Sequence, residues 1–280
     1  MRRALPAERS EAVRFPDGPE IALPRGDVTE GLVRIGDTVR RPPTPASEYV
    51  AAYLRHLQIM GFEGAPRYLG RDDRGRDVLT YLEGDVPGDP VEPWAATDDV
   101  LEGVGRLLRR LHDASRGFAA PPPPRAPGRP AARMHAREPR MVSHRDVTPQ
   151  NTVFRAGAPW GLVDFDLAGE TTRSLDLANT AMHWVPLCDP VDRPPALADA
   201  DVGTRLRRLL DAYGRDRVPA DGLLGACEVR FPDSYAAMKW AAEHEGGGWA
   251  RMWAAGVGDK LQRRVAWFAQ VKDDLVAALA

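Results

Sequence analysis

The chain has few cysteines and few lysines for its 280 residues. Its two cysteines, Cys188 and Cys227, cannot form a disulfide framework, and they lack the CxxC or Cys/His spacing of a zinc site. This usage is typical of a reducing compartment, so we expect a cytoplasmic protein. Lysine occurs only at Lys239, Lys260 and Lys272. A lysine therefore cannot supply the positive charge of any site in the first 200 residues.

Charge of one sign and long apolar runs are also absent. The formal net charge is −2, with 38 Lys+Arg and 40 Asp+Glu interspersed, so the chain lacks the field that attracts nucleic acids or membrane surfaces. No run reaches about 18 apolar residues, and residues 1–15 lack the apolar segment of a signal peptide. We expect no nucleic-acid partner, no membrane and no export by that route, and the sequence leaves the oligomeric state open.

Short strand-like segments and one helical segment fill the first 84 residues. Gly36-Asp37, between GLVRI and TVRR, indicates a hairpin. From about residue 46, apolar residues recur at intervals of three and four, which predicts a helix. Residues 65–84 have the pattern of a second hairpin. We expect residues 1–84 to form a lobe of their own, a small antiparallel sheet with one helix.

Helical patterns dominate after residue 84. An apolar stripe over residues 100–111 predicts a core helix, and the proline-rich residues 119–132 predict an extended connection. Two short strands, TVFR and WGLVDFD, precede helical sequence from about Asp176. Further amphipathic helices are predicted at residues 200–214, 222–243 and 258–279. We therefore expect an α+β, bilobal chain whose residues 85–280 form a larger, mainly helical lobe.

Polar side chains gather after two apolar strands. VSHRDVTPQN places His144, Asp146 and Asn151 in one short loop, and the strand GLV delivers Asp164, with Asp166 two residues later. Oxygen-bearing side chains in this arrangement suit Mg²⁺, which takes one or two carboxylates and completes its shell with water and nucleotide phosphates. A carboxylate that does not bind the metal can accept or orient the proton of an attacking hydroxyl. The motif predicts phosphoryl transfer.

The same motif resembles a known family. His144-Arg145-Asp146, then Asn151, then Asp164-Phe165-Asp166, resembles the catalytic loop and metal-binding segment of the protein-kinase-like fold. The resemblance is closer to aminoglycoside phosphotransferase-like kinases, in which DxD or DxE replaces DFG. VRIGDTVRRP, VLTYLEG and HRDVTPQNTVF also resemble the phosphotransferase enzyme family and its trifolitoxin-immunity-like members. The similarity covers roughly residues 20–190. It implies that residues 1–84 are the nucleotide-binding lobe and that residues 85–280 are the catalytic and substrate-binding lobe.

The resemblance implies a role for each matching residue of the motif. Asp146 would be the catalytic base that binds the acceptor hydroxyl. Asn151 and Asp164 would be the magnesium ligands, and Asp166 would assist a metal or its waters. His144 would brace the loop through hydrogen bonds rather than transfer a proton.

In the family, a lysine on the third strand binds the ATP phosphates and a helix glutamate holds it. This chain has TVRR at that place. Because side chains alternate along a strand, Thr38 and Arg40 share a face, so Arg40 is the expected substitute, with Arg41 second. Arginine keeps the positive charge but is longer than lysine. Glu48, early in the following helix, is the expected partner of Arg40.

Three other positions follow from the resemblance. Gly26, in the turn PRGDVTEG, would let backbone N–H groups cover phosphates. Main-chain groups around Tyr81 and Leu82, in LTYLEG, would bind the edge of adenine. Asp176, in SLDLAN, would cap the next helix and tie it back to the catalytic loop.

We therefore expect an ATP- and Mg²⁺-dependent phosphotransferase that acts on a hydroxyl of a small molecule, an antibiotic or a biosynthetic intermediate. One alternative is a Ser/Thr kinase that acts on a peptide natural-product precursor. Another is a nucleotide-binding pseudokinase or immunity module without turnover, which the arginine at the lysine position would suit.

The region expected to line the acceptor cleft carries charges of both signs. Its acids are Glu228, Asp233, Glu243 and Glu245, and its arginines are Arg230, Arg251 and Arg263. A polycationic aminoglycoside would need an acidic cleft, so this mixture argues mildly against such a substrate.

Overall fold

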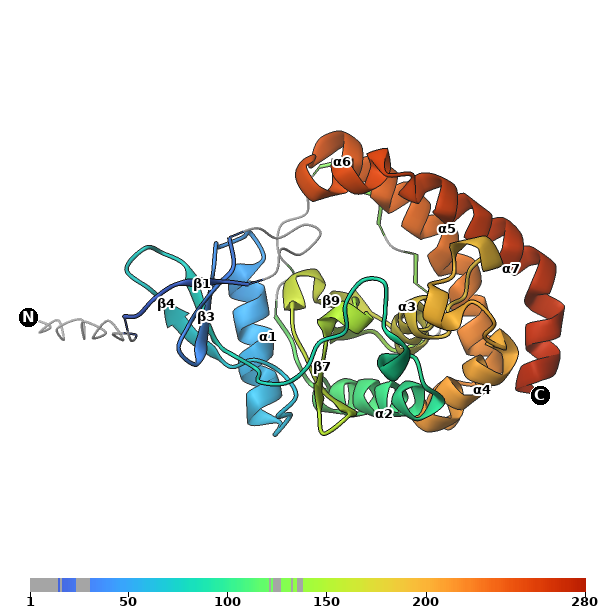
Figure 1. The fold of residues 1–280 in the computed structure, drawn as a ribbon, viewed down its shortest axis with the longest axis horizontal. Helices are drawn as coiled ribbons and strands as arrows, with labels where there is room; N and C mark the ends of the chain where they lie inside the picture. Colours follow the sequence, from blue (N-terminus) through green and yellow to red (C-terminus); the bar gives the residue numbers. More distant parts are fainter. Residues whose placement is uncertain are drawn as a thin grey trace, which may run out of the picture.

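The computed structural model of the protein describes residues 15, 17–23, 31–120, 122, 127–131, 133–134 and 138–280. Strands and one helix make up its N-terminal part, at the left of Figure 1, and helices dominate the remainder. No helix within these described ranges is long and apolar enough to cross a membrane.

A five-stranded antiparallel sheet in the order β1-β2-β3-β5-β4 forms the N-terminal part. Its strands are β1 (Ile21–Ala22), β2 (Val33–Ile35), β3 (Thr38–Arg41), β4 (Tyr68–Arg71) and β5 (Asp77–Thr80). Gly36 and Asp37 form the turn between β2 and β3, with Ile35 opposite Thr38 in the register. Both predicted hairpins are therefore present.

Helix α1 (Ser47–Ile59) joins the sheet to the helical part. Its apolar face is buried, as its periodicity predicted, at Tyr49, Val50, Tyr53, Leu54 and Leu57. Two of its polar groups cross to the end of α2 (Asp98–Ala114). The Tyr53 hydroxyl lies 2.6 Å from Ser115 Oγ, and His56 Nε2 donates to the carbonyl of Ala114 at 3.0 Å. One continuous apolar core thus spans both parts.

The helical part is built on α2, α3 (Arg173–Trp184) and α4 (Val202–Tyr213). Helices α5 (Ala220–His244) and α7 (Val257–Leu279) run side by side, connected by the short α6 (Gly247–Ala254) (Figure 1). The predicted helices at residues 200–214, 222–243 and 258–279 match α4, α5 and α7. Helix α6 was not predicted, because the glycines on either side of it interrupt the apolar pattern.

Two small antiparallel ribbons present the predicted site. Strand β6 (Met141–Ser143) pairs with β9 (Gly169–Thr171), and β7 (Thr152–Arg155) pairs with β8 (Ala158–Leu162). The loop after β6 carries the HRD motif, and the segment after β8 carries Asp164. The ribbons thereby bring two loops together that are about 15 residues apart in the chain.

The connection between the two parts passes very close to β7. Asp85 and Phe154 exchange two backbone hydrogen bonds, of 3.0 and 2.7 Å. Gly84 has a φ of +149°, and a Cβ at this position would lie 2.3 Å from the carbonyl oxygen of Phe154. Only glycine fits this crossing without displacing the backbone.

We expect Gly84→Ala to destabilise the protein and loosen the connection. Gly75→Ala is the matched control, because Gly75 also has a positive φ of +74° but open space around its Cβ position. The control should lower the free energy of unfolding by about 1–2 kcal/mol, the cost of a left-handed alanine. Gly84→Ala should cost a further 1–3 kcal/mol, roughly, from the steric clash. Urea unfolding of the two variants measures the difference, and equal losses would contradict the expectation.

Candidate active site

His144 fixes the loop after β6. Its side chain is fully buried, Nε2 donates to the carbonyl of Val163 at 2.8 Å, and Nδ1 accepts from the backbone N–H of Asp146 at 3.2 Å. The ring also packs on Phe165, with centroids 4.5 Å apart. Burial lowers the pKa of His144, which favours the neutral ring that this donor-acceptor pattern requires. These contacts are those of a brace between the two site loops.

Side chains of helix α3 donate hydrogen bonds to the backbone of the same loop. Asn179 Nδ2 donates to the carbonyl of Arg145 at 2.6 Å, and Trp184 Nε1 donates to the carbonyl of Val147 at 2.9 Å. Arg145 has a φ of +66°, an uncommon conformation for a non-glycine residue. The Asn179 bond satisfies its carbonyl in that conformation.

Asp146 and Asn151 face one another across the loop. Asn151, at the end of the 3₁₀ turn Pro149–Asn151, donates through Nδ2 to the Asp146 carbonyl at 3.0 Å and to Asp146 Oδ2 at 2.9 Å. Burial and then the charge of Asp164 raise the pKa of Asp146 to about 6. Asp146 is therefore ionised at neutral pH, yet a better proton acceptor than an ordinary aspartate.

Asp164 is the most constrained of the site carboxylates. It has a left-handed backbone (φ +59°) and begins the 3₁₀ turn Phe165–Leu167. Its Oδ1 is buried and has no hydrogen-bond partner, and the nearest cation is Arg41 Nη1 at 3.9 Å. Burial, and secondarily Asp166, raises the pKa of Asp164. A buried, unsatisfied carboxylate oxygen is what a missing cation would leave behind.

Arg41, rather than Arg40, reaches this site. Arg41 Nη2 forms an ion pair with Asp166 Oδ2. Arg40 points to the opposite face of the strand, where its Nη1 donates to Thr38 Oγ1 and its Nε lies 3.7 Å from Asp72. Thr38 and Arg40 do share one face of β3, as predicted. The opposite face, which carries Arg41, is the one turned toward the site.

The expected pairing of Glu48 with Arg40 is wrong. Glu48 is exposed and pairs with Arg71 at 2.9 Å, because the first turn of α1 lies beside β4. Arg40 is 1% exposed, on the far side of β3 from Arg41.

The predicted adenine-binding segment is only partly available. The N–H of Tyr81 donates to the carbonyl of Asp37 at 2.8 Å, and the Tyr81 ring lies under the guanidinium of Arg34 at 3.7 Å. The main-chain groups of Leu82 are therefore better placed than the Tyr81 N–H to meet a base. Gly26 lies outside the described residues.

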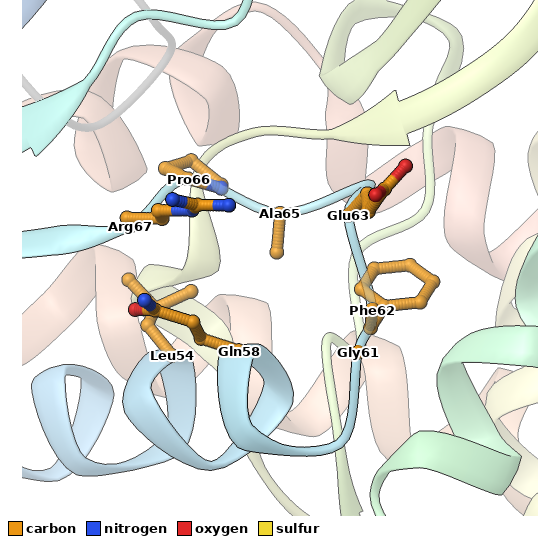
Figure 2. A pocket seen from close by; sticks show the side chains of 8 residues that line it. All are labelled: Leu54, Gln58, Gly61, Phe62, Glu63, Ala65, Pro66 and Arg67. Atoms are coloured by element: carbon orange, nitrogen blue, oxygen red, sulfur yellow. The ribbon is translucent and has the colours of Figure 1, made fainter.

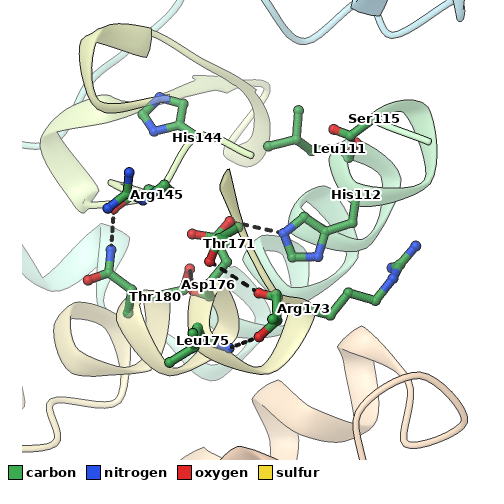
Figure 3. Close-up of polar contacts among 12 residues, drawn as sticks. Leu111, His112, Ser115, His144, Arg145, Thr171, Arg173, Leu175, Asp176 and Thr180 are labelled. Atoms are coloured by element: carbon green, nitrogen blue, oxygen red, sulfur yellow. Dashed lines mark hydrogen bonds and ion pairs between the residues drawn. The ribbon is translucent and has the colours of Figure 1, made fainter. Parts of the chain in front are cut away.

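Asp176 is not the cap of α3. Thr172 caps this helix by accepting from the N–H of Leu175 at 3.3 Å. Asp176 lies one turn inside the helix, 1% exposed, and its Oδ2 accepts from His112 Nε2 at 2.9 Å (Figure 3). Hydrogen bonds from His112, and its charge, hold the pKa of Asp176 below its usual value despite burial, which alone would raise it.

That contact continues as a buried polar chain. His112 Nδ1 lies 2.7 Å from the Tyr213 hydroxyl, which accepts from Arg173 Nη1 at 2.9 Å. Helices α2, α3 and α4 are thus joined beneath the HRD loop. Sequence reasoning missed His112 and Tyr213, because each is an ordinary member of an apolar helix stripe. Only the hydrogen bonds that they form in the folded structure distinguish them from ordinary core residues.

A hollow of about 120 Å³ lies on another face of the molecule. Figure 2 shows Leu54 and Gln58 on α1 facing the loop that carries Glu63 to Arg67. None of the predicted site residues lines it. The described residues also contain no group of three or more His, Cys, Asp or Glu side chains suited to a metal. A cation at Asp164 would therefore need, besides the carboxylates, the Asn151 side chain or an oxygen atom of a bound substrate.

Comparisons with known proteins identify the family of the chain. The model of the phosphotransferase enzyme family matches residues 127–223. The trifolitoxin immunity protein of Rhizobium leguminosarum bv. trifolii is 34% identical over 213 residues, covering 73% of this chain and 78% of that protein.

Solved structures are similar over nearly the whole length. A choline/ethanolamine kinase family protein from Mesorhizobium loti has a TM-score of 0.59 at 18% identity, covering 94% of this chain and 92% of its own. A putative aminoglycoside phosphotransferase from Ralstonia eutropha JMP134 has a TM-score of 0.58 at 13% identity, covering 91% and 94%. The expected bilobal, protein-kinase-like fold is confirmed.

The raised pKa of Asp146 makes a prediction for stability. Well below pH 3.8 the carboxyl is protonated in both the folded and the unfolded state, so Asp146→Asn should change stability little. Above pH 6 the folded state carries a charge that burial and Asp164 disfavour, whereas the unfolded state ionises near 3.8. In metal-free buffer at pH 8, Asp146→Asn should therefore raise the free energy of unfolding by about 1–3 kcal/mol.

Urea unfolding at pH 8, 6 and 4.5 measures this gain, which should shrink as the pH falls. Asp273→Asn, at an exposed position of α7, is the control and should show no such trend. A gain that is independent of pH would contradict the assignment.

Proposed function

The chain belongs to the phosphotransferase enzyme family, and on that premise we propose that it transfers the γ-phosphate of ATP to a hydroxyl of a small molecule. The observation that carries the proposal is the convergence of Asp146, Asn151 and Asp164 on one half-buried place between the sheet and the helical part. Residues 1–84 would bind the nucleotide and residues 85–280 would carry catalysis and the acceptor. The supply of ATP places this activity in the cytoplasm.

The residues present fit a magnesium ion. Asn151 donates through Nδ2, which leaves its carbonyl oxygen Oδ1 for a cation, and Asp164 offers its unsatisfied Oδ1. These atoms would hold Mg²⁺, with Asp166 assisting, and the bound ion would neutralise charge on the phosphates.

Asp146 performs the proton chemistry of the proposed reaction. The acceptor hydroxyl binds its carboxylate, and the hydroxyl oxygen forms a bond to the γ-phosphorus as the bond to the β–γ bridging oxygen breaks. ADP leaves with that oxygen, and the hydroxyl proton passes to Asp146. The nearby Asn151 Nδ2 holds the carboxylate in orientation.

Arg41 takes the place of the lysine in this proposal. Its guanidinium already lies between Asp164 and Asp166, where the phosphates would enter. Arginine offers phosphate oxygens a planar pair of donors. Nucleotide entry would then exchange the bond to Asp166 for bonds to phosphate.

A binding module without turnover is the second candidate. The bond between Arg41 and Asp166 favours it, because this contact occupies a carboxylate that catalysis would need. The similarity to an immunity protein is compatible with either function.

Asp146→Asn separates the two candidates. With Mg²⁺ and a panel of hydroxyl compounds, the wild type should release ADP and yield a phosphorylated product, detected by mass spectrometry. The variant should bind ATP with unchanged affinity and lose at least about 100-fold in turnover, since the proton acceptor is gone. Tight ATP binding with no product from either protein would favour the binding module.

Arg41→Ala and Arg40→Ala form a matched pair one residue apart. We expect Arg41→Ala to weaken ATP·Mg²⁺ binding by about 10- to 100-fold, the loss of a charge-assisted phosphate contact. Arg40→Ala should leave the affinity within about threefold, because Arg40 faces away from the site and contacts Asp72 instead. Calorimetric titration measures both. A larger loss for Arg40→Ala would restore Arg40 as the phosphate-binding residue.

A further inference from the structure

The acids that could make an acidic acceptor cleft are already paired. Asp233 accepts from the N–H and Nε of Arg133, at 2.8 and 2.6 Å. The other pairs are Glu245 with Arg129, Glu228 with Lys272 and Glu243 with Lys239. Their charge is therefore largely neutralised within the protein, and a polycationic acceptor would have to displace these cations.

Arg230, on α5, has neutral partners instead. Its Nε and Nη2 donate to Asn179 Oδ1 at 3.1 and 2.8 Å, and Nη1 donates to Ser234 Oγ. Asn179 in turn holds the Arg145 carbonyl of the catalytic loop. The Arg230 charge is close enough to lower the pKa of Asp146 against the effect of burial. Arg230 is therefore a half-buried cation next to the proposed transfer site.

Arg264, on α7, also has only neutral partners, among them the Cys188 thiol and the Phe231 ring, whose centroid lies 5.8 Å from its Cζ. Its Nη1 contacts Met182 Sδ at 3.6 Å, and its Nε is buried without a hydrogen-bond partner. The nearest acid on this side, Asp192, is held by both arms of Arg263, at 2.8 and 2.6 Å. Within the described part of the chain, neither Arg230 nor Arg264 has a carboxylate oxygen within 4.0 Å.

The two arginines share one neighbourhood around His183 on α3. Burial, then Arg264 and Arg230, lowers the pKa of His183 to about 3, so the imidazole is neutral. Arg230 contacts Asn179 and Arg264 contacts Met182, three residues apart on α3, so the two arginines lie against the same side of that helix. Burial, then Arg145 and Arg264, lowers the pKa of Arg230 to about 10, and burial lowers the pKa of Arg264. Two half-buried cations without a close counter-charge repel one another. A bound anion would relieve that repulsion.

We infer that Arg230 and Arg264 form the binding site for an anionic group of the acceptor. The acceptor would be a hydroxyl compound bearing a carboxylate or a phosphate, oriented with its hydroxyl on Asp146. This inference rests on the proposed function and names its substrate class. It sets the chain apart from an enzyme for polycationic acceptors.

The test compares matched ligands on a protein that cannot turn over. Asp146→Asn is saturated with ADP and Mg²⁺, so that the nucleotide site is filled, and titrated calorimetrically. The probes are glycerate against its neutral amide, glycerol 3-phosphate against glycerol, and kanamycin as a polycation. We expect the anionic member of at least one pair to bind at least tenfold more tightly than its neutral partner. Preference for glycerate or for glycerol 3-phosphate distinguishes a carboxylate from a phosphate.

Repeating the titration on the double variant Asp146→Asn/Arg264→Met tests whether Arg264 causes the preference for anionic probes. The preference should be lost, and Arg264→Lys should restore part of it, with ADP binding unchanged in both. Preference for neutral compounds or kanamycin, absence of any anionic preference, or a preference that survives Arg264→Met would overturn the inference. If the wild-type protein transfers phosphate to glycerol or kanamycin, the inference is overturned but the proposed function stands. Failure to bind ADP would remove both.

Stability gives an independent readout. If Arg264 is an uncompensated cation, Arg264→Met keeps the apolar stem and removes the repulsion, so the melting temperature without ligand should be unchanged or higher. Adding 50 mM sulfate should stabilise the ADP-bound wild type more than this variant. A structural role would give the opposite result, a lower melting temperature and equal stabilisation by sulfate, and would overturn the inference.

Discussion

The site depends on holding like charges together. Asp146, Asp164 and Asp166 lie within a half-buried space where their carboxylates repel. Burial first, and then the neighbouring carboxylate, raises the pKa of both Asp146 and Asp164. The repulsion is acceptable only because the surrounding structure leaves the carboxylates no alternative arrangement. The buried ring of His144 supplies the central constraint, since it binds the backbone at residue 163 with one nitrogen and at residue 146 with the other.

The remaining polar network supports that constraint from the helical part. The HRD loop has little regular structure, so side chains of α3 satisfy its carbonyls, Asn179 from one side and Trp184 from the other. The chain from His112 to Asp176 fixes α3 against α2 in turn. A partly satisfied buried network is costly, so each of these groups is held in one geometry by the others. The backbone of the loop is therefore held by side chains that belong to the buried core.

The features that the sequence predicted depend on residues close together in the chain. The features that it did not predict depend on contacts between residues far apart in the chain. The aspartates at strand ends and the hairpin turn are local patterns, and they appeared where the spacing placed them. Alternation along β3 correctly paired residues 38 and 40, but it could not tell which face meets the helical part, and that face carries Arg41. Asp176 looked like a cap in a local window, whereas its partner His112 is 64 residues away. Arg230 acquires its role through Asn179, 51 residues away, and no local pattern marks such a contact.

Net charge is a poor guide to the sign of a site in this chain. The total of −2 combines many close pairs, and what an acceptor meets is the charge left after those pairs have formed. On α5, the acids Glu228, Asp233 and Glu243 form ion pairs, whereas Arg230 on α5 and Arg264 on α7 have only neutral partners, so the charge left unpaired next to the proposed transfer site is positive. Arg230 also acts on Asp146, because its positive charge opposes the rise in the pKa of Asp146 that burial and Asp164 cause. A bound anion would offset that charge, raise the proton affinity of Asp146 and thereby couple occupancy of the acceptor site to the strength of the base.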